Sequence, residues 1–102
     1  MEIKSYQRKY LRSLAHHIKP VAQIGKLGIT EGLLSLIDQH LSKNELIKIK
    51  FLHYKDNKKK YTEKISNVTK SSIAGYIGNV AILYRRSDEL LNRHIKLPNR
   101  SI

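Results

Sequence analysis

Residues 21–30 read VAQIGKLGIT, and this stretch places a strand, a loop and a helix start next to one another. Pro20 cannot continue a helix, so the apolar residues that follow it predict a short strand over 20–24. Thr30 is a favourable N-cap, because its side-chain oxygen can accept a hydrogen bond from the first turn of a helix. We therefore expect a helix over about 31–42, joined to the strand by a short loop.

The loop itself is a Gly-x-x-Gly tetrad made of Gly25, Lys26, Leu27 and Gly28. Such a loop presents backbone N–H groups and a lysine where a phosphate can approach. The alternative is a tight turn that needs glycine for positive φ angles and does nothing more. The charge of the chain favours the phosphate: 20 Lys and Arg stand against 8 Asp and Glu, which gives a net charge of +12 and a pI of about 10.1. A surface this basic is typical of proteins that bind a polyanion, and nucleic acid is the leading class.

Length and composition exclude several other classes of protein. At 102 residues the chain is long enough for one domain and too short for two. It has no cysteine, which excludes disulfides, thiolate zinc sites and cysteine nucleophiles. The charged N-terminus lacks the apolar stretch of a signal peptide, and the longest apolar run, Val80 to Tyr84, is far too short to span a membrane. We therefore expect a cytoplasmic protein with no membrane partner.

Hydrophobic periodicity predicts three helices and four strands along the chain. Apolar residues recur at helical spacing over 6–18, 31–42 and 61–69, whereas residues 20–24, 45–53, 72–77 and 80–85 have strand character. Gly78-Asn79 separates the last two strands and suits a tight hairpin turn, so those strands should be antiparallel. The other connections contain helices, and each should join strands that run in the same direction. Residues 55–60 read as a polar turn, and residues 87–102 as a polar tail that contains at most one more short ordered segment.

The order α-β-α-β-α-β-β predicts an α/β fold with a four-stranded mixed sheet. In the second strand, Ile47, Ile49 and Phe51 alternate with Lys48, Lys50 and Leu52. Lysines at alternate positions indicate that one side of this strand faces solvent. We therefore expect one face of the sheet to be less covered than the other, as in a two-layer sandwich rather than a doubly wound sheet.

Several short motifs follow one another in an order that is characteristic of one family. They are Tyr10-Leu11-Arg12, Leu14-Ala15-His16-His17-Ile18-Lys19-Pro20, Gln23-Ile24-Gly25-Lys26, Gly28-Ile29-Thr30, Glu45-Leu46-Ile47-Lys48-Ile49-Lys50, Tyr76-Ile77-Gly78 and Leu83-Tyr84-Arg85. Together they resemble the CRM domain, the chloroplast RNA splicing and ribosome maturation module, in its stand-alone bacterial YhbY-like form. The resemblance covers roughly residues 5–86, which makes it more specific than any one tetrad. It divides the chain into a CRM-like RNA-binding domain, residues 1–86, and a C-terminal tail, residues 87–102.

The resemblance implies an RNA-binding function and a fold similar to the C-terminal domain of translation initiation factor three. By likeness to KH domains, it implies that residues 25–28 contact RNA. Bacterial single-domain members look like factors that associate with precursors of the large ribosomal subunit, so precursor ribosomal RNA is the expected partner. Tyr76 departs from the family pattern, because we expect a polar residue there, and nothing is carried over onto the tail.

Basic residues outside the loop are the remaining candidates for RNA binding. The outer face and the end of the first predicted helix carry Arg8, Lys9, Arg12, His17 and Lys19. The short link between this helix and the loop suggests that they lie side by side, and these cations would then extend a track for phosphates. Weaker candidates are Lys48, Lys50, Arg85 and Arg86, because exposed strand lysines also protect sheet edges. Tyr54 and Tyr76 are the tyrosines most suited to stacking on unpaired bases.

Two other functions fit parts of the sequence. His16 and His17 could serve a small ribonuclease or RNA-modifying enzyme, but adjacent helix residues point about 100° apart and cannot both address one phosphate. The tail could instead recruit another protein, with RNA binding incidental. The carboxylates are scattered, and the sequence has neither a His-x-x-x-His pair nor a cysteine to suggest a metal site. We therefore predict a monomeric RNA-binding protein with no catalytic residue, metal, cofactor or small-molecule substrate.

Overall fold

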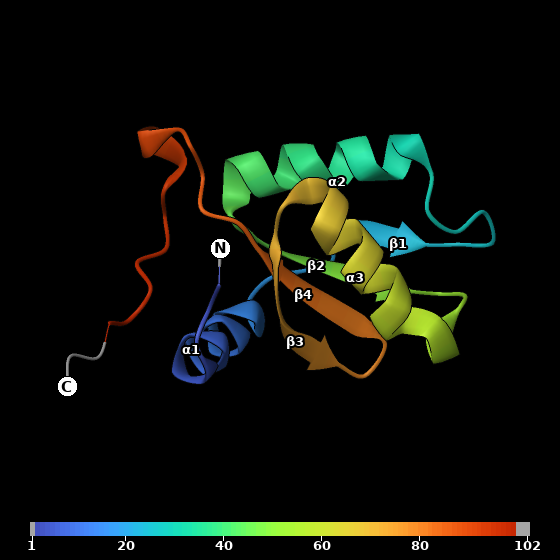
Figure 1. Cartoon of the computed structure of the whole chain (residues 1–102), viewed down its shortest axis with the longest axis horizontal. Helices are drawn as coiled ribbons and strands as arrows, with labels where there is room; N and C mark the ends of the chain where they lie inside the picture. Colours follow the sequence, from blue (N-terminus) through green and yellow to red (C-terminus); the bar gives the residue numbers. More distant parts are fainter. Residues whose placement is uncertain (1, 100–102) are drawn as a thin grey trace.

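The computed structural model describes residues 2–99 as a four-stranded sheet packed with three α-helices (Figure 1). The helices are α1 (Ser5–Ala15), α2 (Glu31–Asn44) and α3 (Lys58–Thr69), and two short 3₁₀ turns are η1 (Lys55–Asn57) and η2 (Leu90–Asn92). The strands are β1 (Ala22–Ile24), β2 (Leu46–Phe51), β3 (Ser72–Ile77) and β4 (Val80–Tyr84). The predicted α/β class and the predicted order of helices and strands are confirmed. Helix α1 ends three residues earlier than predicted, because the chain turns well before Pro20.

The sheet is mixed, and its strand order is β1-β2-β4-β3. β1 pairs with β2 in parallel, with Ala22 opposite Ile49, and β4 pairs antiparallel with both β2 and β3. β2 and β3 therefore run in the same direction, as predicted for strands joined by a helix, but β4 lies between them. The β3–β4 hairpin turns at Gly78, whose φ of 56° suits glycine.

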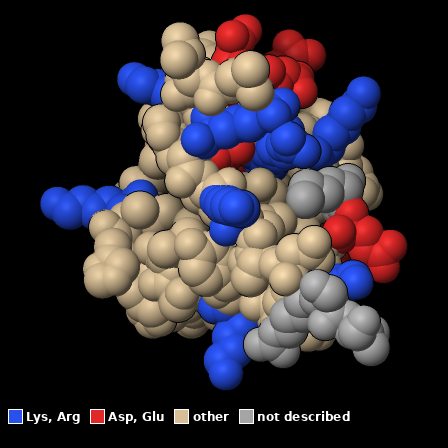
Figure 2. Space-filling model, turned by 90° about the vertical axis from the view of Figure 1, so that its left-hand side faces the viewer, with Lys and Arg blue, Asp and Glu red and all other residues tan. Residues whose placement is uncertain are grey.

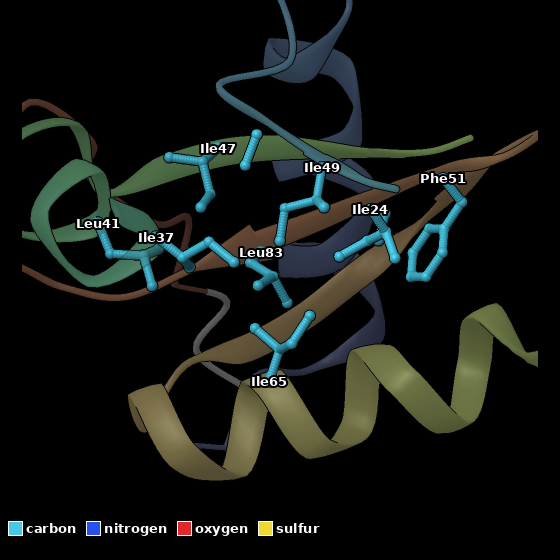
Figure 3. Packing of buried hydrophobic residues seen from close by; sticks show 10 residues of the cluster. Ile24, Ile37, Leu41, Ile47, Ile49, Phe51, Ile65 and Leu83 are labelled. Carbon is cyan, nitrogen blue, oxygen red and sulfur yellow. The ribbon is translucent and has the colours of Figure 1, made fainter. Parts of the chain in front are cut away.

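The larger core lies between one face of the sheet and the helices α2 and α3 (Figure 3). Ile47, Ile49 and Phe51 project into this core from alternate positions of β2. Ile37 from α2 and Ile65 from α3 lie in the same cluster, and these side chains are almost completely buried. The alternation in the sequence thus identified the face of β2 that packs against the helices.

The opposite face of the sheet is also covered, although by fewer elements. Leu46, Ile82 and Tyr84 form a second core with Leu11 and Ala15 of α1. Apolar side chains of the C-terminal segment pack against the margin of this core. The arrangement therefore differs from a strict two-layer sandwich, because α1 and this segment form a third, smaller layer. The physical reason is that β2 and β4 carry large apolar side chains on this face too, and these side chains require cover.

A buried carboxylate fixes the C-terminal segment, residues 87–97, to the rest of the domain. Glu45 follows α2 with a φ of 67° and has 0% exposed surface. Its Oε2 accepts a hydrogen bond from the backbone N–H of Ser87 at 2.8 Å, and its Oε1 accepts bonds from those of His94 at 2.7 Å and Ile95 at 3.1 Å. These donors compensate the burial of the negative charge. The predicted tail is therefore anchored to the domain at Ser87, His94 and Ile95; its last three residues lie outside the described part.

Candidate nucleic-acid interface

The Gly-x-x-Gly loop forms a tight turn between β1 and α2. The N–H of Gly28 donates to the carbonyl of Gly25 at 3.0 Å, and Gly28 has a φ of 68°, which favours glycine. Lys26 and Leu27 occupy the tip and are exposed, Leu27 over 87% of its surface. The carbonyl of Ile24 accepts backbone bonds from residues 52 and 53 at 3.0 and 3.1 Å, so the loop leaves the sheet at a fixed point. The loop is thus a tight turn that also presents a cation and an apolar side chain outward.

The start of α2, next to the loop, is capped by the protein itself. Thr30 Oγ1 accepts a hydrogen bond from the N–H of Leu33 at 3.1 Å, as the sequence predicted. Glu31 occupies the first turn, where a carboxylate interacts favourably with the positive end of the helix. The helix end already has an acceptor and an anion of its own. A phosphate bound here would therefore depend mainly on the loop and on neighbouring lysines.

Two tyrosines support the loop. The rings of Tyr54 and Tyr61 are stacked, with centroids 5.1 Å apart and planes inclined by 28°. The Tyr54 hydroxyl donates to the carbonyl oxygen of Lys26 at 2.5 Å. Both rings lie close to Gly28, since a Cβ there would be 3.7 Å from each of them. Tyr54 therefore holds the loop, and Tyr61 covers one face of the ring that we predicted to stack on a base.

We expect Tyr54→Phe to loosen the loop without unfolding the domain. The substitution keeps the ring stack but removes the hydrogen bond to Lys26, which contributes about 0.5–1.5 kcal/mol. Amide hydrogen exchange at residues 26–28 should accelerate several-fold, while the melting temperature falls by no more than about 12 °C. Tyr10→Phe, in α1, is the matched control and should leave exchange in the loop unchanged. Equal exchange rates in both variants would show that the Tyr54 hydroxyl does not hold the loop.

A hollow of about 400 Å³ between the loop and α3 brings aromatic rings and lysines together. The residues that line it include Gly28, Tyr54, Lys60, Tyr61 and Lys64. Lys60 and Lys64 are one turn apart in α3, so they lie on the same face of the helix. Positive charge therefore lies both at the tip of the loop and on the adjacent helix. We call Lys26, Lys60 and Lys64, with residues 25–28, the loop cluster.

A second hollow, of about 430 Å³, lies between the loop and the first turns of α2. Its lining is largely apolar and small, and it includes Gly32, Leu33 and Leu36 beside residues 25–28. Leu36 is 39% exposed, so part of this apolar surface faces solvent. An apolar hollow beside a cationic loop suits a nucleobase whose phosphates stay on the lysines.

Lys60 and Lys64 are not among the candidates predicted from the sequence. The sequence predicts a polar turn over residues 55–60, whereas α3 begins at Lys58. The signal that could have identified them is the spacing of the two lysines around Tyr61, which places two charges and an aromatic ring within one helical turn.

Helix α1 does not lie beside the loop, contrary to the expectation from the short link. It packs on the opposite face of the sheet from α2 and α3, and Figure 1 shows it at the lower left, while the loop lies at the far right. The link joins α1 to the start of β1, whereas the loop follows the end of that strand. Lys9, His17 and Lys19 are exposed and Arg8 is half-buried, but these cations do not line the hollows beside the loop. Any RNA contact that they make belongs to a different part of the surface.

Arg12 has a structural role in α1. Its Nη1 donates to the carbonyl oxygen of Ala74 at 3.0 Å. A Cβ on Gly75 would lie 2.7 Å from the Cδ of Arg12, so the glycine permits the arginine to cross β3 at close range. The pairing of β3 with β4 is irregular at this point, between Ile73 and Gly75. Arg12 thus binds α1 to the sheet at an irregular part of β3.

Arg85 joins the C-terminal ends of α2 and α3. Its Nη1 lies 2.6 Å from a carboxylate oxygen of Asp38 and donates to the carbonyl of Thr69 at 2.8 Å, while its Nη2 donates to Ser42 Oγ at 2.7 Å. This bonding explains why an arginine follows β4 without any appeal to RNA.

The other predicted strand cations differ from one another. Lys48 is half-buried, and its Nζ donates to the carbonyl of Ile18 at 2.9 Å, beneath the link that follows α1. Lys50 and Arg86 are exposed, and Arg86 lines a groove formed with the C-terminal segment.

Tyr76 packs against the core on the side of α3. It is half-buried, and burial raises the pKa of its hydroxyl, while a hydrogen bond with Thr62 acts in the opposite direction. The residue that departs from the family pattern therefore has a packing role here.

The features that bear on the enzymatic alternative are few. His16 and His17 are both exposed at the end of α1. Among residues 2–99, no group of three or more His, Cys, Asp or Glu side chains is arranged to hold a metal ion. In the same part of the chain, no helix combines the length and the apolar character needed to cross a bilayer.

Comparisons with known proteins agree with this architecture. The family model of the CRS1 / YhbY (CRM) domain matches residues 3–85. A Bacillus subtilis protein named "Probable RNA-binding protein YqeI" is 36% identical over 93 residues, which cover 90% of this chain and 95% of the relative. A Haemophilus influenzae protein named "RNA-binding protein" is 35% identical over 99 residues, which cover 96% of this chain and 97% of the relative. The solution structure of the hypothetical protein SAV1595 from Staphylococcus aureus is similar with a TM-score of 0.81 and 43% identity, covering 95% of this chain and 100% of that one.

Proposed function

The chain belongs to the CRS1 / YhbY (CRM) domain family, and from this membership we propose that it binds RNA through the loop cluster. Two relatives that match nearly the whole chain are named as RNA-binding proteins, which supports this proposal. We propose further that the RNA is precursor ribosomal RNA of the large subunit. The protein would act there as a cytoplasmic monomer that holds the RNA without cleaving it.

The observation that carries the proposal is the grouping of exposed lysines around a glycine turn. Lys26 is at the tip of the turn, and Lys60 and Lys64 line the hollow next to it. The backbone at Gly25 is open to close approach, because a Cβ there would meet nothing within 4 Å. An RNA strand that bends around the loop could place its phosphates on the lysines and one base in the apolar hollow near Leu36.

Binding should weaken linearly when log K is plotted against log salt concentration. If the loop cluster neutralises about three to five phosphates of single-stranded RNA, the slope should lie between about −2 and −3.5. Fluorescence anisotropy with a labelled RNA measures the slope, and electrophoresis of the recovered RNA should show it intact. A flat salt response would contradict phosphate binding, and cleavage that His16→Ala or His17→Ala abolishes would establish the enzymatic alternative.

The proposed role in ribosome assembly predicts where the protein sediments in cell extracts. On sucrose gradients it should travel with precursors of the large subunit and be depleted from translating ribosomes. Charge alone would give loose association with every RNA-rich fraction, which raised salt should remove evenly. A specific factor should keep its preference for the precursor peak as salt rises. An even distribution over both subunits and polysomes would leave RNA binding in place but remove the assembly role.

A further inference from the structure

A second candidate surface lies between α1 and the C-terminal segment, at the other end of the molecule from the loop. Figure 1 shows α1 and this segment at the left and the loop at the right. A groove there, which we call the helix–tail groove, has a volume of about 630 Å³, within the range of small-molecule sites. Leu14, Ile18 and Leu46 give it an apolar lining. Its size and apolar lining are suited to a flat organic ring.

Aromatic rings and cations accompany this apolar lining. Tyr10 lines the helix–tail groove and is 37% exposed, and the exposed residues His17, Lys19 and His94 line it as well. Tyrosine and histidine rings can stack on an unpaired base, and a lysine beside them can meet the adjoining phosphate.

A second groove continues the first along the C-terminal segment. We call it the arginine groove; its volume is about 350 Å³, and Arg86, Arg93 and Lys96 line it. It shares His94 and Ile95 with the helix–tail groove. Figure 2 shows this side of the molecule, with a group of Lys and Arg side chains in its upper half and Asp and Glu side chains above and next to them. Of the described residues that line these two grooves, none is Asp or Glu, so the lining suits an anion.

The segment that carries these cations is held in place. Glu45 accepts hydrogen bonds from the backbone N–H groups of His94 and Ile95, which lie between Arg93 and Lys96 in the chain. Arg93 Nε donates to the carbonyl of Ser87 at 2.7 Å, and farther along the Gln7 side chain donates to a backbone carbonyl at 3.1 Å. A preorganised site loses less conformational entropy on binding than a free tail would.

We propose that the two grooves bind an unpaired segment of RNA. A base stacks in the helix–tail groove, and the neighbouring phosphates lie on Arg86, Arg93 and Lys96. The proposal rests on the proposed function and adds to it a second RNA site, so that one protein contacts two RNA segments at opposite ends. An acidic peptide would satisfy the cations, but the apolar groove with Tyr10 at its side matches a base better than a carboxylate.

Direct binding of single-stranded RNA by the full chain tests this proposal. The probe is a short unpaired RNA that contains 4-thiouridine, and a hairpin of the same composition is the comparison. Tyr10→Ala and Lys96→Glu should each weaken binding of the unpaired RNA by about five- to tenfold, because each removes one stacking or phosphate contact. Lys70→Glu makes the same charge change at an exposed residue outside both grooves, and its effect should stay below about twofold. Thermal melting of each variant checks that the domain is folded.

Cross-linking shows which surface the RNA occupies. Irradiation should join 4-thiouridine to peptides that contain Tyr10, His17 or His94, and these links should persist in a Lys60→Glu/Lys64→Glu variant. Loss of affinity in that variant alone, with links confined to residues 25–28 and α3, would overturn this inference and leave the loop function standing. A loss of RNA affinity only in the groove variants would support this site and contradict RNA binding by the loop cluster. Folded groove variants that bind the unpaired RNA like the parent, but lose binding of a polyglutamate peptide, would assign the grooves to an acidic protein instead.

Discussion

Replacing Glu45 with alanine is expected to lower the free energy of unfolding by about 2–4 kcal/mol. The carboxylate is fully buried and accepts hydrogen bonds from the backbone N–H groups of Ser87, His94 and Ile95. Without it, the buried N–H of Ser87 and the part-buried N–H groups of His94 and Ile95 lose their acceptor, or the segment detaches and uncovers the second core. Urea denaturation measures the loss, and faster amide exchange at the same residues would show that this segment opens first.

Two further variants separate the carboxylate from other effects at this position. Glu45→Gln keeps the length of the side chain and one acceptor oxygen. It should therefore lower the free energy of unfolding by less than Glu45→Ala does. Glu63→Ala removes an exposed carboxylate from α3 and should change the free energy of unfolding by less than about 0.5 kcal/mol. If Glu45→Ala behaves like Glu63→Ala, some other contact holds the C-terminal segment.

The role of Glu45 illustrates what local sequence patterns do not contain. A glutamate between a helix and a strand normally faces solvent, and the partners of this one lie more than 40 residues later in the chain. Its positive φ turns the chain from α2 into β2 and is equally invisible in hydrophobic periodicity. The sequence predicted a polar tail with at most one short ordered segment, and the anchoring of this tail by Glu45 was not predicted.

Local patterns did suffice for the elements whose burial is regular. The alternation of Ile47, Ile49 and Phe51 predicted β2 and its buried face, and Thr30 predicted the start of α2. The layers of the fold were harder to predict. Leu46 and Ile82 are buried on the second face of the sheet, which the lysines of β2 had indicated to be open to solvent. Which helix covers which face depends on long-range packing, and the placement of α1 could not be read from its own amphipathic pattern.

The same distinction applies to the candidate site. Residues 25–28 were identified from the chain alone, because a glycine turn between a strand and a helix is a local pattern. Lys60 and Lys64 join them because α3 packs beside Tyr54 and the loop, and their local spacing around Tyr61 does not report this long-range packing. Conversely, Arg12 and Arg85 were candidates by charge, and the structure uses both as hydrogen-bond donors within the fold.

Reversing the charge of Lys60 and Lys64 together is expected to lower RNA affinity by about 100-fold at moderate salt. Each reversal removes an attraction and adds a repulsion near the surface, an effect of about 1.4 kcal/mol or tenfold. Both side chains are exposed, so the free energy of unfolding should change little. The slope of log K against log salt should also become shallower by about 1.4, the contribution of two phosphate contacts on single-stranded RNA.

Matched variants decide whether this loss belongs to the loop cluster. Lys59→Glu/Lys70→Glu makes the same charge change on exposed residues at the two ends of α3, which do not line the hollow at the loop, and should weaken binding much less. Lys60→Gln/Lys64→Gln removes attraction without adding repulsion, so its effect should fall between the two. Equal losses in both charge-reversal pairs would mean that RNA responds to the net charge of +12 and not to the position of the lysines. A loss confined to the pair at residues 60 and 64, together with a loss of about tenfold in Lys26→Glu, would tie the affinity to the turn at residues 25–28, because Lys60 and Lys64 line the hollow beside that turn and α1 lies across the sheet from it.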